Sequence, residues 1–148
     1  MAMPSSYYML HLPYRLVLCS ASPRRRELLK TIAGDFEVRS VDFDESFPPN
    51  LKKEDVVLYL AREKARHAKT RMQSGELGIT ADTIVWFEGQ VLNKPADRAE
   101  AVSMLNRLSG CEHSVFTGVC LFTEKKVKLF SAHTRVWFKK LSAMEIAY

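Results

Sequence analysis

The sequence predicts an α/β domain built on a mixed, twisted sheet with flanking helices. Helical and strand patterns alternate in the first part of the chain, whereas strand patterns follow one another near its end. With 148 residues, the chain is long enough for one domain with a substantial core. We therefore expect residues 1–14 to form an N-terminal extension and residues 15–148 to form a single domain.

The first strand is expected in the apolar run 16–19, and it leads into a helix that Ser22 caps and Gly34 ends. Alternation of apolar and polar residues then indicates a strand over 36–41. An apolar stripe indicates a helix over 54–72, which Gly75 and Gly78 end, and a hairpin of 79–87 and 91–92 follows. A capping box opens a helix over 97–109, and the last strands are expected over 114–123 and 127–139. A last capping box, Ser142-x-x-Glu145, opens a helix of barely one turn. The domain is therefore expected to be C-terminally incomplete.

The overall charge favours an anionic ligand but not a stable complex with nucleic acid. The formal net charge is +5, yet part of the basic excess lies in scattered pairs, and there is no long basic tract. The three cysteines show no CxxC spacing, which fits a reducing, cytoplasmic environment. No apolar stretch approaches the roughly 20 residues that a membrane-spanning helix needs, so no membrane association is expected.

The first turn of the first expected helix is unusually basic. A helix N-terminus carries partial positive charge, so the run Arg24, Arg25 and Arg26 is unfavourable there without an anion. Solvated surface arginines are the alternative interpretation. Together with the hydroxyls of Ser20 and Ser22 and with free backbone N–H groups, the arginines instead predict a cradle for a polyphosphate.

One carboxylate lies where a strand should be apolar. Asp82 interrupts the run 79–87, and a buried carboxylate is costly unless it is paired, metal-bound or protonated. It is either a cap at the end of a strand or a metal ligand and general base. Glu45 in the acidic loop is a second candidate ligand. Lys64 interrupts an apolar helix stripe, so it either extends out of the core or reaches into a site.

These residues together suit the hydrolysis of a phosphoanhydride. Arg24, Arg25, Lys64 and Lys94 would hold the phosphates, while a divalent cation, Mg²⁺ or Mn²⁺, would bridge phosphate and carboxylate, and Asp82 would help to deprotonate water. The sequence has no Walker A loop, no GxGxxG, no zinc-like histidine spacing and no evident Ser-His-Asp signature.

Four motifs stand in an order and spacing that resemble one known family. They are Ser20-Ala-Ser-Pro-Arg-Arg-x-Glu-Leu-Leu, Leu60-Ala-Arg-Glu-Lys-Ala, Ala81-Asp-Thr-Ile-Val and Asn93-Lys-Pro. The chain resembles the Maf (septum formation protein) family over residues 15–148. The resemblance implies an ITPase-like fold of the Maf and Ham1 type. It also implies a cytoplasmic nucleoside triphosphate pyrophosphatase that uses a divalent cation, and it allows a homodimer.

The resemblance also assigns roles to individual residues. It makes Asp82 the proton acceptor and lets Arg24 and Thr83 help to set base specificity. It places six residues around the phosphates: Ser20, Ser22, Arg24, Arg25, Lys64 and Lys94. The Ala-Asp-Thr form is similar to the branch that prefers dTTP and UTP, whereas the 7-methyl-GTP branch tends to have Ser-Asp-Gln.

The chain departs from the family pattern at two places. The third motif usually reads Gly-Lys-Pro, whereas this chain has Asn93, which can also adopt a left-handed conformation. The family continues into a Lys-Ala-Gly…Ile-Gln segment that this sequence does not contain. Two alternatives to the pyrophosphatase therefore stay open: a nucleotide-binding regulatory module of cell division with weak or no hydrolysis, and a nucleic-acid-binding domain.

Overall fold

The computed structural model describes residues 12–148, so residues 1–11 of the expected extension lie outside the described residues. The elements are β1 (Arg15–Leu18), α1 (Pro23–Ala33), β2 (Glu37–Val38), α2 (Glu54–Lys69), β3 (Glu76–Phe87), β4 (Gln90–Leu92), α3 (Arg98–Leu108), β5 (Glu112–Phe122), β6 (Val127–Trp137) and α4 (Ala143–Ala147). None of these described helices is long and apolar enough to cross a membrane.

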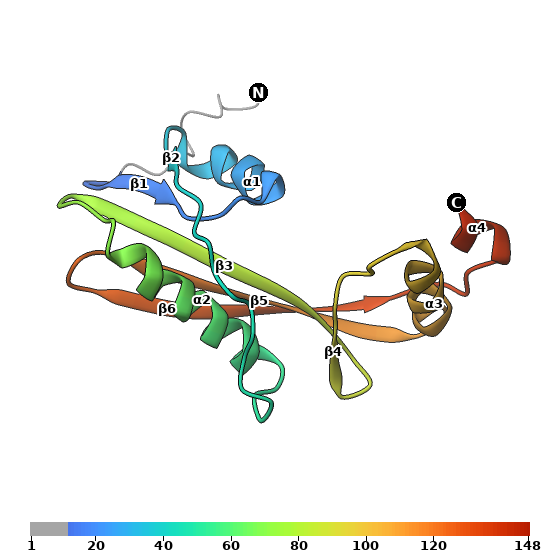
Figure 1. Ribbon diagram of the computed structural model, residues 1–148. Coiled ribbons are helices and arrows are strands. Elements are labelled where there is room, and N and C mark those ends of the chain that lie inside the picture. The colour runs from blue at the N-terminus through green and yellow to red at the C-terminus, as the bar shows by residue number, and fades with distance from the viewer. Residues whose placement is uncertain (1–11) are drawn as a thin grey trace, which may run out of the picture.

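The strands form one mixed sheet, as predicted (Figure 1). Its order is β2-β1-β3-β5-β6, and β4 pairs with β3 off this path. The neighbours β2, β1 and β3 run parallel, whereas β4, β5 and β6 join by antiparallel pairing. The parallel part comes from the alternating half of the sequence because a parallel return needs a crossover, and the antiparallel part comes from the consecutive strands.

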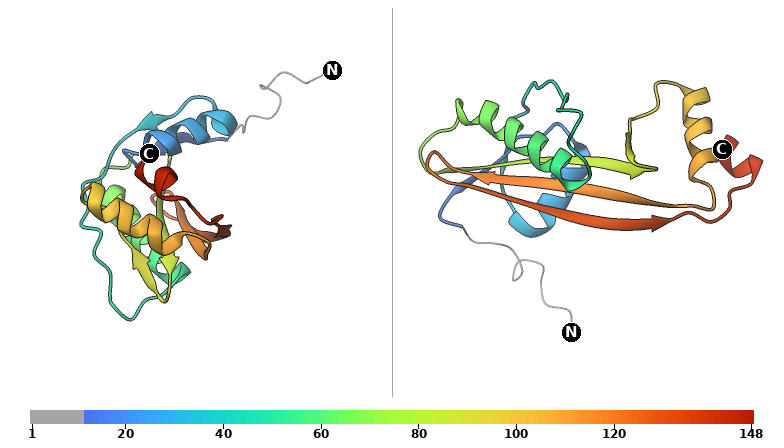
Figure 2. Two further views of the ribbon diagram at one scale, coloured as in Figure 1. Left: turned by 90° about the vertical axis from the view of Figure 1, so that its right-hand side faces the viewer. Right: turned by 90° about the horizontal axis from the view of Figure 1, so that it is seen from below.

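Helix α2 covers one face of the long strands β3 and β5 (Figure 2). The predicted stripe of this helix is buried, namely Val57, Leu60, Ala61, Ala65 and Ala68, and Val56 is buried with it. The helix approaches closely because Gly118 of β5 has no side chain: a Cβ there would lie 2.5 Å from the carbonyl oxygen of Val57. This close packing fixes how far α2 lies from the sheet.

Helices α1 and α2 lie on opposite faces of the sheet. The connection from β1 to β2 and the connection from β2 to β3 run in opposite directions across the strand order. Because such crossovers are right-handed, their helices fall on opposite faces. Side chains agree: the hydroxyl of Thr80 donates to Ala61 of α2, whereas Thr83 contacts Arg25 of α1. In open α/β sheets, ligands bind in a crevice at the carboxyl ends of the strands where such a reversal occurs, so the carboxyl end of β1 is the expected place for a ligand in this fold.

Several element boundaries differ from the sequence-based expectation. Gly78 does not end a helix but lies within β3, where the ring of Phe122 on the neighbouring strand fills the place that a Cβ would take. The strand expected over 36–41 is only Glu37–Val38, although the N–H of Arg39 still donates to the carbonyl of Leu18 at 2.9 Å. The packing at Gly78 depends on a side chain from another strand, which local sequence patterns do not report.

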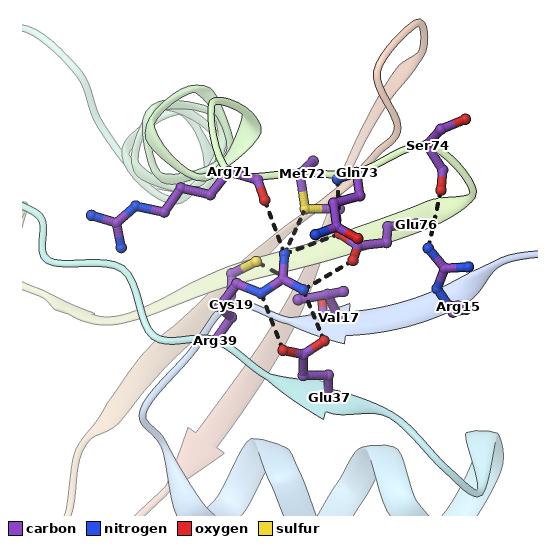
Figure 3. A network of polar contacts seen from close by, with 10 residues as sticks. All are labelled: Arg15, Val17, Cys19, Glu37, Arg39, Arg71, Met72, Gln73, Ser74 and Glu76. Carbon is purple, nitrogen blue, oxygen red and sulfur yellow. Dashed lines mark hydrogen bonds and ion pairs between the residues drawn. The ribbon is translucent and has the colours of Figure 1, made fainter.

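Near the start of β3, a cluster of charged side chains forms several hydrogen bonds and ion pairs (Figure 3). Arg39 donates to both carboxylate oxygens of Glu76 at 3.0 Å and to Glu37 at 2.8 Å. The backbone N–H of Gln73 also donates to Glu76, which is 4% exposed. These bonds lower the pKa of Glu76 to about 2 and raise the pKa of Arg39. We call Glu37, Arg39 and Glu76 the Arg39 cluster, and it links β2 to the start of β3.

The C-terminal capping box forms as expected. The Ser142 hydroxyl accepts from the N–H of Glu145, and the Glu145 carboxylate accepts from the N–H of Ser142. The resulting five-residue helix α4 lies against α3, where the guanidinium of Arg98 donates to the carbonyl of Ala147. A helix this short owes its stability to these contacts.

Candidate active site

One edge of β3 has a gap in its strand pairing. On this edge β1 pairs with β3 only up to Ile79, and β4 begins to pair at Val85. Residues 80–84 therefore have no strand partner on this side within the described part of the chain, although β5 pairs with them on the other. The gap lies beside the carboxyl end of β1, where the direction of the crossovers reverses.

Side chains replace the absent strand at this gap. The carbonyl of Ala81 accepts from Arg25 Nη1 at 3.0 Å, and the backbone N–H of Thr83 donates to Asp82 Oδ1 at 3.1 Å. Both backbone groups would otherwise pair with a neighbouring strand. A guanidinium from α1 and a carboxylate from β3 thus meet the same short stretch of exposed edge.

The polyphosphate cradle predicted from the first turn of α1 forms in part. Ser22 caps the helix by accepting from the N–H of Arg25, and Pro23 opens it, as expected. The Ser20 hydroxyl accepts from Arg25 Nη1 at 3.4 Å, and Thr83 Oγ1 accepts from Arg25 Nη2 at 3.3 Å. Arg24 is exposed. Of the predicted cradle residues, Ser20, Ser22 and Arg25 are thus assembled.

On the α2 side of the same strand, Asp82 and Lys64 form a buried ion pair. The Lys64 Nζ lies 2.6 Å from Asp82 Oδ2, and the side chains are 13% and 10% exposed. The ammonium of Lys64 is the polar partner of Oδ2 among the described residues. Lys64 therefore reaches the carboxylate rather than extending out of the core. Asp82 is not only a cap, although its Oδ1 does accept from the backbone of Thr83.

A second carboxylate reaches the same ammonium group. Glu45 Oε1 lies 3.1 Å from Lys64 Nζ, on a side chain that is 68% exposed. Within residues 12–148, no group of three or more His, Cys, Asp or Glu side chains could hold a metal ion. Mg²⁺, however, commonly takes only one or two protein carboxylates and completes its shell with phosphate and water. Asp82 and Glu45 fit such a cation, because an oxygen of each converges on one positive charge.

Lys94 is not brought into contact with the other candidates. It lies exposed in the loop after β4 and makes no hydrogen bond or ion pair with any described residue. In the acidic loop, the carboxylate of Asp44 accepts hydrogen bonds from the backbone N–H and the hydroxyl of Ser46, so it is engaged within the loop. The candidate residues that the structure brings together are Ser20, Ser22, Arg25, Glu45, Lys64, Asp82 and Thr83.

Two residues next to the site were missed by the sequence-based prediction. Thr117 Oγ1 lies 3.0 Å from Thr83 Oγ1, directly across from it in register. Gly118 lies opposite Asp82 and allows the close approach of α2 that carries Lys64. A glycine inside a predicted strand is itself a signal of close backbone approach. Thr117 gave no such signal, because a cross-strand partner is visible only once the register is known.

The arrangement combines groups that bind anions with a group that accepts a proton. The guanidinium of Arg25 and the ammonium of Lys64 supply positive charge on opposite sides of one strand edge. Asp82 adds a carboxylate whose Oδ2 contacts the ammonium of Lys64. This is a chemistry for binding a phosphate ester or anhydride and removing a proton next to it.

Comparisons with known proteins give relatives for almost the whole domain. A dTTP/UTP pyrophosphatase of Bacteroides thetaiotaomicron is 50% identical over 136 residues, which cover 91% of this chain and 70% of that protein. A protein of the same name from Parabacteroides distasonis is 49% identical with the same coverage. The one from Flavobacterium psychrophilum is 40% identical over 90% of this chain and 69% of its own length.

The fold has a neighbour among solved structures. The Ham1 protein of Staphylococcus aureus superposes with a TM-score of 0.52 at 16% identity, covering 83% of this chain and 71% of that one. The ITPase-like, Ham1-type fold predicted from the sequence is therefore confirmed. The family model for Maf-like proteins matches residues 15–148, and with these identities it shows that the chain belongs to the Maf-like family.

Proposed function

We propose that this chain is a nucleoside triphosphate pyrophosphatase that hydrolyses dTTP and UTP to the monophosphate and pyrophosphate. Relatives named dTTP/UTP pyrophosphatase share up to half of its residues. The observation that carries the proposal is the Asp82 carboxylate, which is buried in β3, paired with Lys64 at 2.6 Å and next to the unpaired strand edge that Arg25 contacts. A buried charged pair beside a further cationic group is a candidate functional site.

In this proposal, Asp82 is the general base. A water molecule attacks the α-phosphorus, the bond from that phosphorus to the oxygen bridging to the β-phosphate breaks, and pyrophosphate leaves with the electron pair. The proton of the attacking water passes to Oδ2 of Asp82, while Oδ1 stays held by the N–H of Thr83. That bond fixes the orientation of the carboxylate before the substrate arrives.

The phosphates are held by the cationic groups around this carboxylate. Arg25 is already oriented by Ser20, Ala81 and Thr83, and its remaining N–H groups are available to phosphate oxygens. Ser20 and Ser22 lie with Arg25 on the α1 side of the strand edge, and Lys64 approaches from the α2 side. Arg24 and Lys94 are exposed and complete the phosphate site in this proposal by turning toward the substrate.

A divalent cation, Mg²⁺ or Mn²⁺, is the proposed cofactor, with Asp82 and Glu45 as its protein ligands. When bound, it neutralises charge on the phosphates and favours attack at phosphorus. Lys64, which contacts both carboxylates, supplies a further positive charge to the same place. The family resemblance adds a cytoplasmic location and a homodimer to the proposal.

Base preference is assigned to Thr83 and Arg24. Thr83 is exposed in the middle of an otherwise largely buried strand, so its hydroxyl is accessible to a ligand in the crevice. The dTTP/UTP preference rests on its identity as threonine and on the names of the relatives.

Pyrophosphate release from dTTP, UTP, CTP, ITP and 7-methyl-GTP, with Mg²⁺ or Mn²⁺, tests the proposal. We expect release from dTTP and UTP to exceed release from the other nucleotides, and release to require the metal. A preference for 7-methyl-GTP would reject the base assignment. Binding of dTTP without any release would instead identify a nucleotide-binding module.

A further inference from the structure

We propose that Thr117 is a positioning residue of this site. It holds the hydroxyl of Thr83 and, through it, the guanidinium of Arg25. The inference rests on the proposed function, because it takes Arg25 as a ligand of the nucleotide phosphates. Thr117 itself is not assigned a contact with the substrate.

The first support is the geometry of three side chains from three elements. Arg25 comes from α1, Thr83 from β3 and Thr117 from β5. Arg25 Nη2 lies 3.3 Å from Thr83 Oγ1, which lies 3.0 Å from Thr117 Oγ1. The two threonines are direct cross-strand partners, a placement that holds their side chains side by side on one face.

The second support is the direction of the hydrogen bonds. A guanidinium only donates, so Thr83 Oγ1 must accept from Arg25. The threonine pair then shares one further hydrogen bond, donated by either hydroxyl. In both cases Thr83 Oγ1 is held from two sides. Without Thr117, only the longer contact with Arg25 would fix its rotation.

The third support is that Thr83 has to be oriented by something other than packing. Its side chain is exposed, unlike those of Asp82 and Ile84 on either side of it. Next across the sheet from Thr117 stands Ala132 of β6, which is also exposed and has no polar side-chain group. The orientation of the Thr83 hydroxyl therefore depends on its cross-strand partner, the hydroxyl of Thr117.

The decisive experiment compares Thr117→Val with Thr117→Ser. Valine keeps the β-branched shape and removes the hydroxyl, whereas serine keeps the hydroxyl and removes the methyl group. The primary measurement is calorimetric affinity for α,β-imido-dTTP, a nucleotide that cannot be cleaved at the scissile position. We expect Thr117→Val to bind about tenfold more weakly, as for the loss of a hydrogen bond to a charged network. Thr117→Ser should stay within about twofold of wild type.

A double-mutant cycle tests whether Thr117 acts through Thr83. The loss in Thr83→Val/Thr117→Val should equal the loss in Thr83→Val alone, because the second hydroxyl then has nothing to position. Thr134→Val in β6 is the matched control, since this exposed threonine makes no hydrogen bond with a described residue. Its affinity should equal that of the wild type.

Turnover provides a second readout. Because Arg25 holds the phosphates in both the ground state and the transition state, Thr117→Val should raise KM for dTTP about tenfold and leave kcat within about twofold. Unchanged affinity in Thr117→Val, equal losses in the serine and valine variants, or additive losses in the cycle would each overturn the inference. Absence of hydrolysis by the wild type, with the affinity series intact, would overturn the proposed function instead.

Discussion

Strand β3 carries two buried carboxylates whose surroundings differ. Near its start, Glu76 accepts from Arg39 with both oxygens and from the N–H of Gln73. In its middle, Asp82 has one oxygen held by the N–H of Thr83 and the other paired with the ammonium of Lys64. Glu76 makes three hydrogen bonds, whereas each oxygen of Asp82 has one partner and can accept a further ligand or a proton.

The two carboxylates have different roles: Glu76 stabilises the fold, whereas Asp82 is assigned to function. A saturated carboxylate contributes to folding, as the lowered pKa of Glu76 indicates. A carboxylate with fewer partners keeps acceptor capacity that a ligand or a proton can use. Substitutions near Glu76 should therefore change stability, whereas substitutions near Asp82 should change nucleotide binding or turnover.

The largest expected effect is that of Asp82→Asn on turnover. The amide cannot accept the proton of water, so kcat for dTTP should fall about 10³-fold. Nucleotide affinity should stay the same or rise, because a negative charge beside the phosphates is removed. Pyrophosphate release and calorimetry measure the two quantities. Turnover within about tenfold of the wild type would reject Asp82 as the general base.

Acid pH should reveal the contribution of Glu76 to stability. In the unfolded chain this carboxylate takes up a proton near its usual pKa of 4.5, but in the folded protein only near a pKa of about 2. Its stabilisation is therefore complete above about pH 4.5 and is lost as the pH falls from 4.5 toward 2. Urea unfolding should show Glu76→Gln to be about 3 kcal/mol less stable than wild type at pH 7.

As the pH falls to about 2, most of the difference between Glu76→Gln and the wild type should disappear, because the carboxyl is then protonated in the unfolded chain and about half protonated in the folded protein. The kcat of the folded variant should equal that of the wild type. A constant stability difference from pH 7 to pH 2 would contradict the assignment.

Alanine substitutions of Arg25 and Arg39 distinguish the candidate site from the Arg39 cluster in the same way. Arg25→Ala should weaken nucleotide affinity about 20-fold, because a charged ligand of the phosphates is lost, and should change the free energy of unfolding by less than about 1 kcal/mol. Arg39→Ala is the matched control: it leaves Glu76 buried without its partner and should lower stability by about 3 kcal/mol. Equal effects of the two substitutions on affinity would contradict the division.

Glycine substitutions should give the smallest effects. A Cβ at Gly118 would meet backbone of α2, so Gly118→Ala should displace the helix that carries Lys64 and lower kcat several-fold. A Cβ at Gly78 would meet only the ring of Phe122, so Gly78→Ala should lower stability by about 1–3 kcal/mol without changing kcat. Thermal unfolding and pyrophosphate release on both variants check this; equal kcat values would show that the position of α2 is not set at Gly118.

Much of the fold was predictable because its signals are local. The cap at Ser22, the glycine after α1 and the apolar stripe of α2 each depend on residues within one element, and the structure has all three. The mixed sheet followed from the order of helix and strand patterns. Errors arose where a distant side chain decides, as with the Phe122 ring over Gly78.

The site was predictable in composition but not in its contacts. Asp82 and Lys64 each stood out as a charge inside an apolar pattern, yet only the packing of α2 on β5 shows that they meet. Lys94 carried a motif and lies apart from the others in the structure. Thr117 carried no motif and lies beside Thr83, because strand register is a property of the assembled sheet.

The gap in strand pairing along β3 also makes the site observable without any added probe. Backbone amides in a continuous ladder exchange their hydrogens slowly, whereas those at an open edge exchange through much smaller fluctuations. The N–H of Thr83 depends on a side-chain oxygen of Asp82 rather than on a neighbouring strand. Its exchange rate should therefore follow the ionisation and occupancy of the carboxylate, so that hydrogen–deuterium exchange at this one amide reports directly on the crevice.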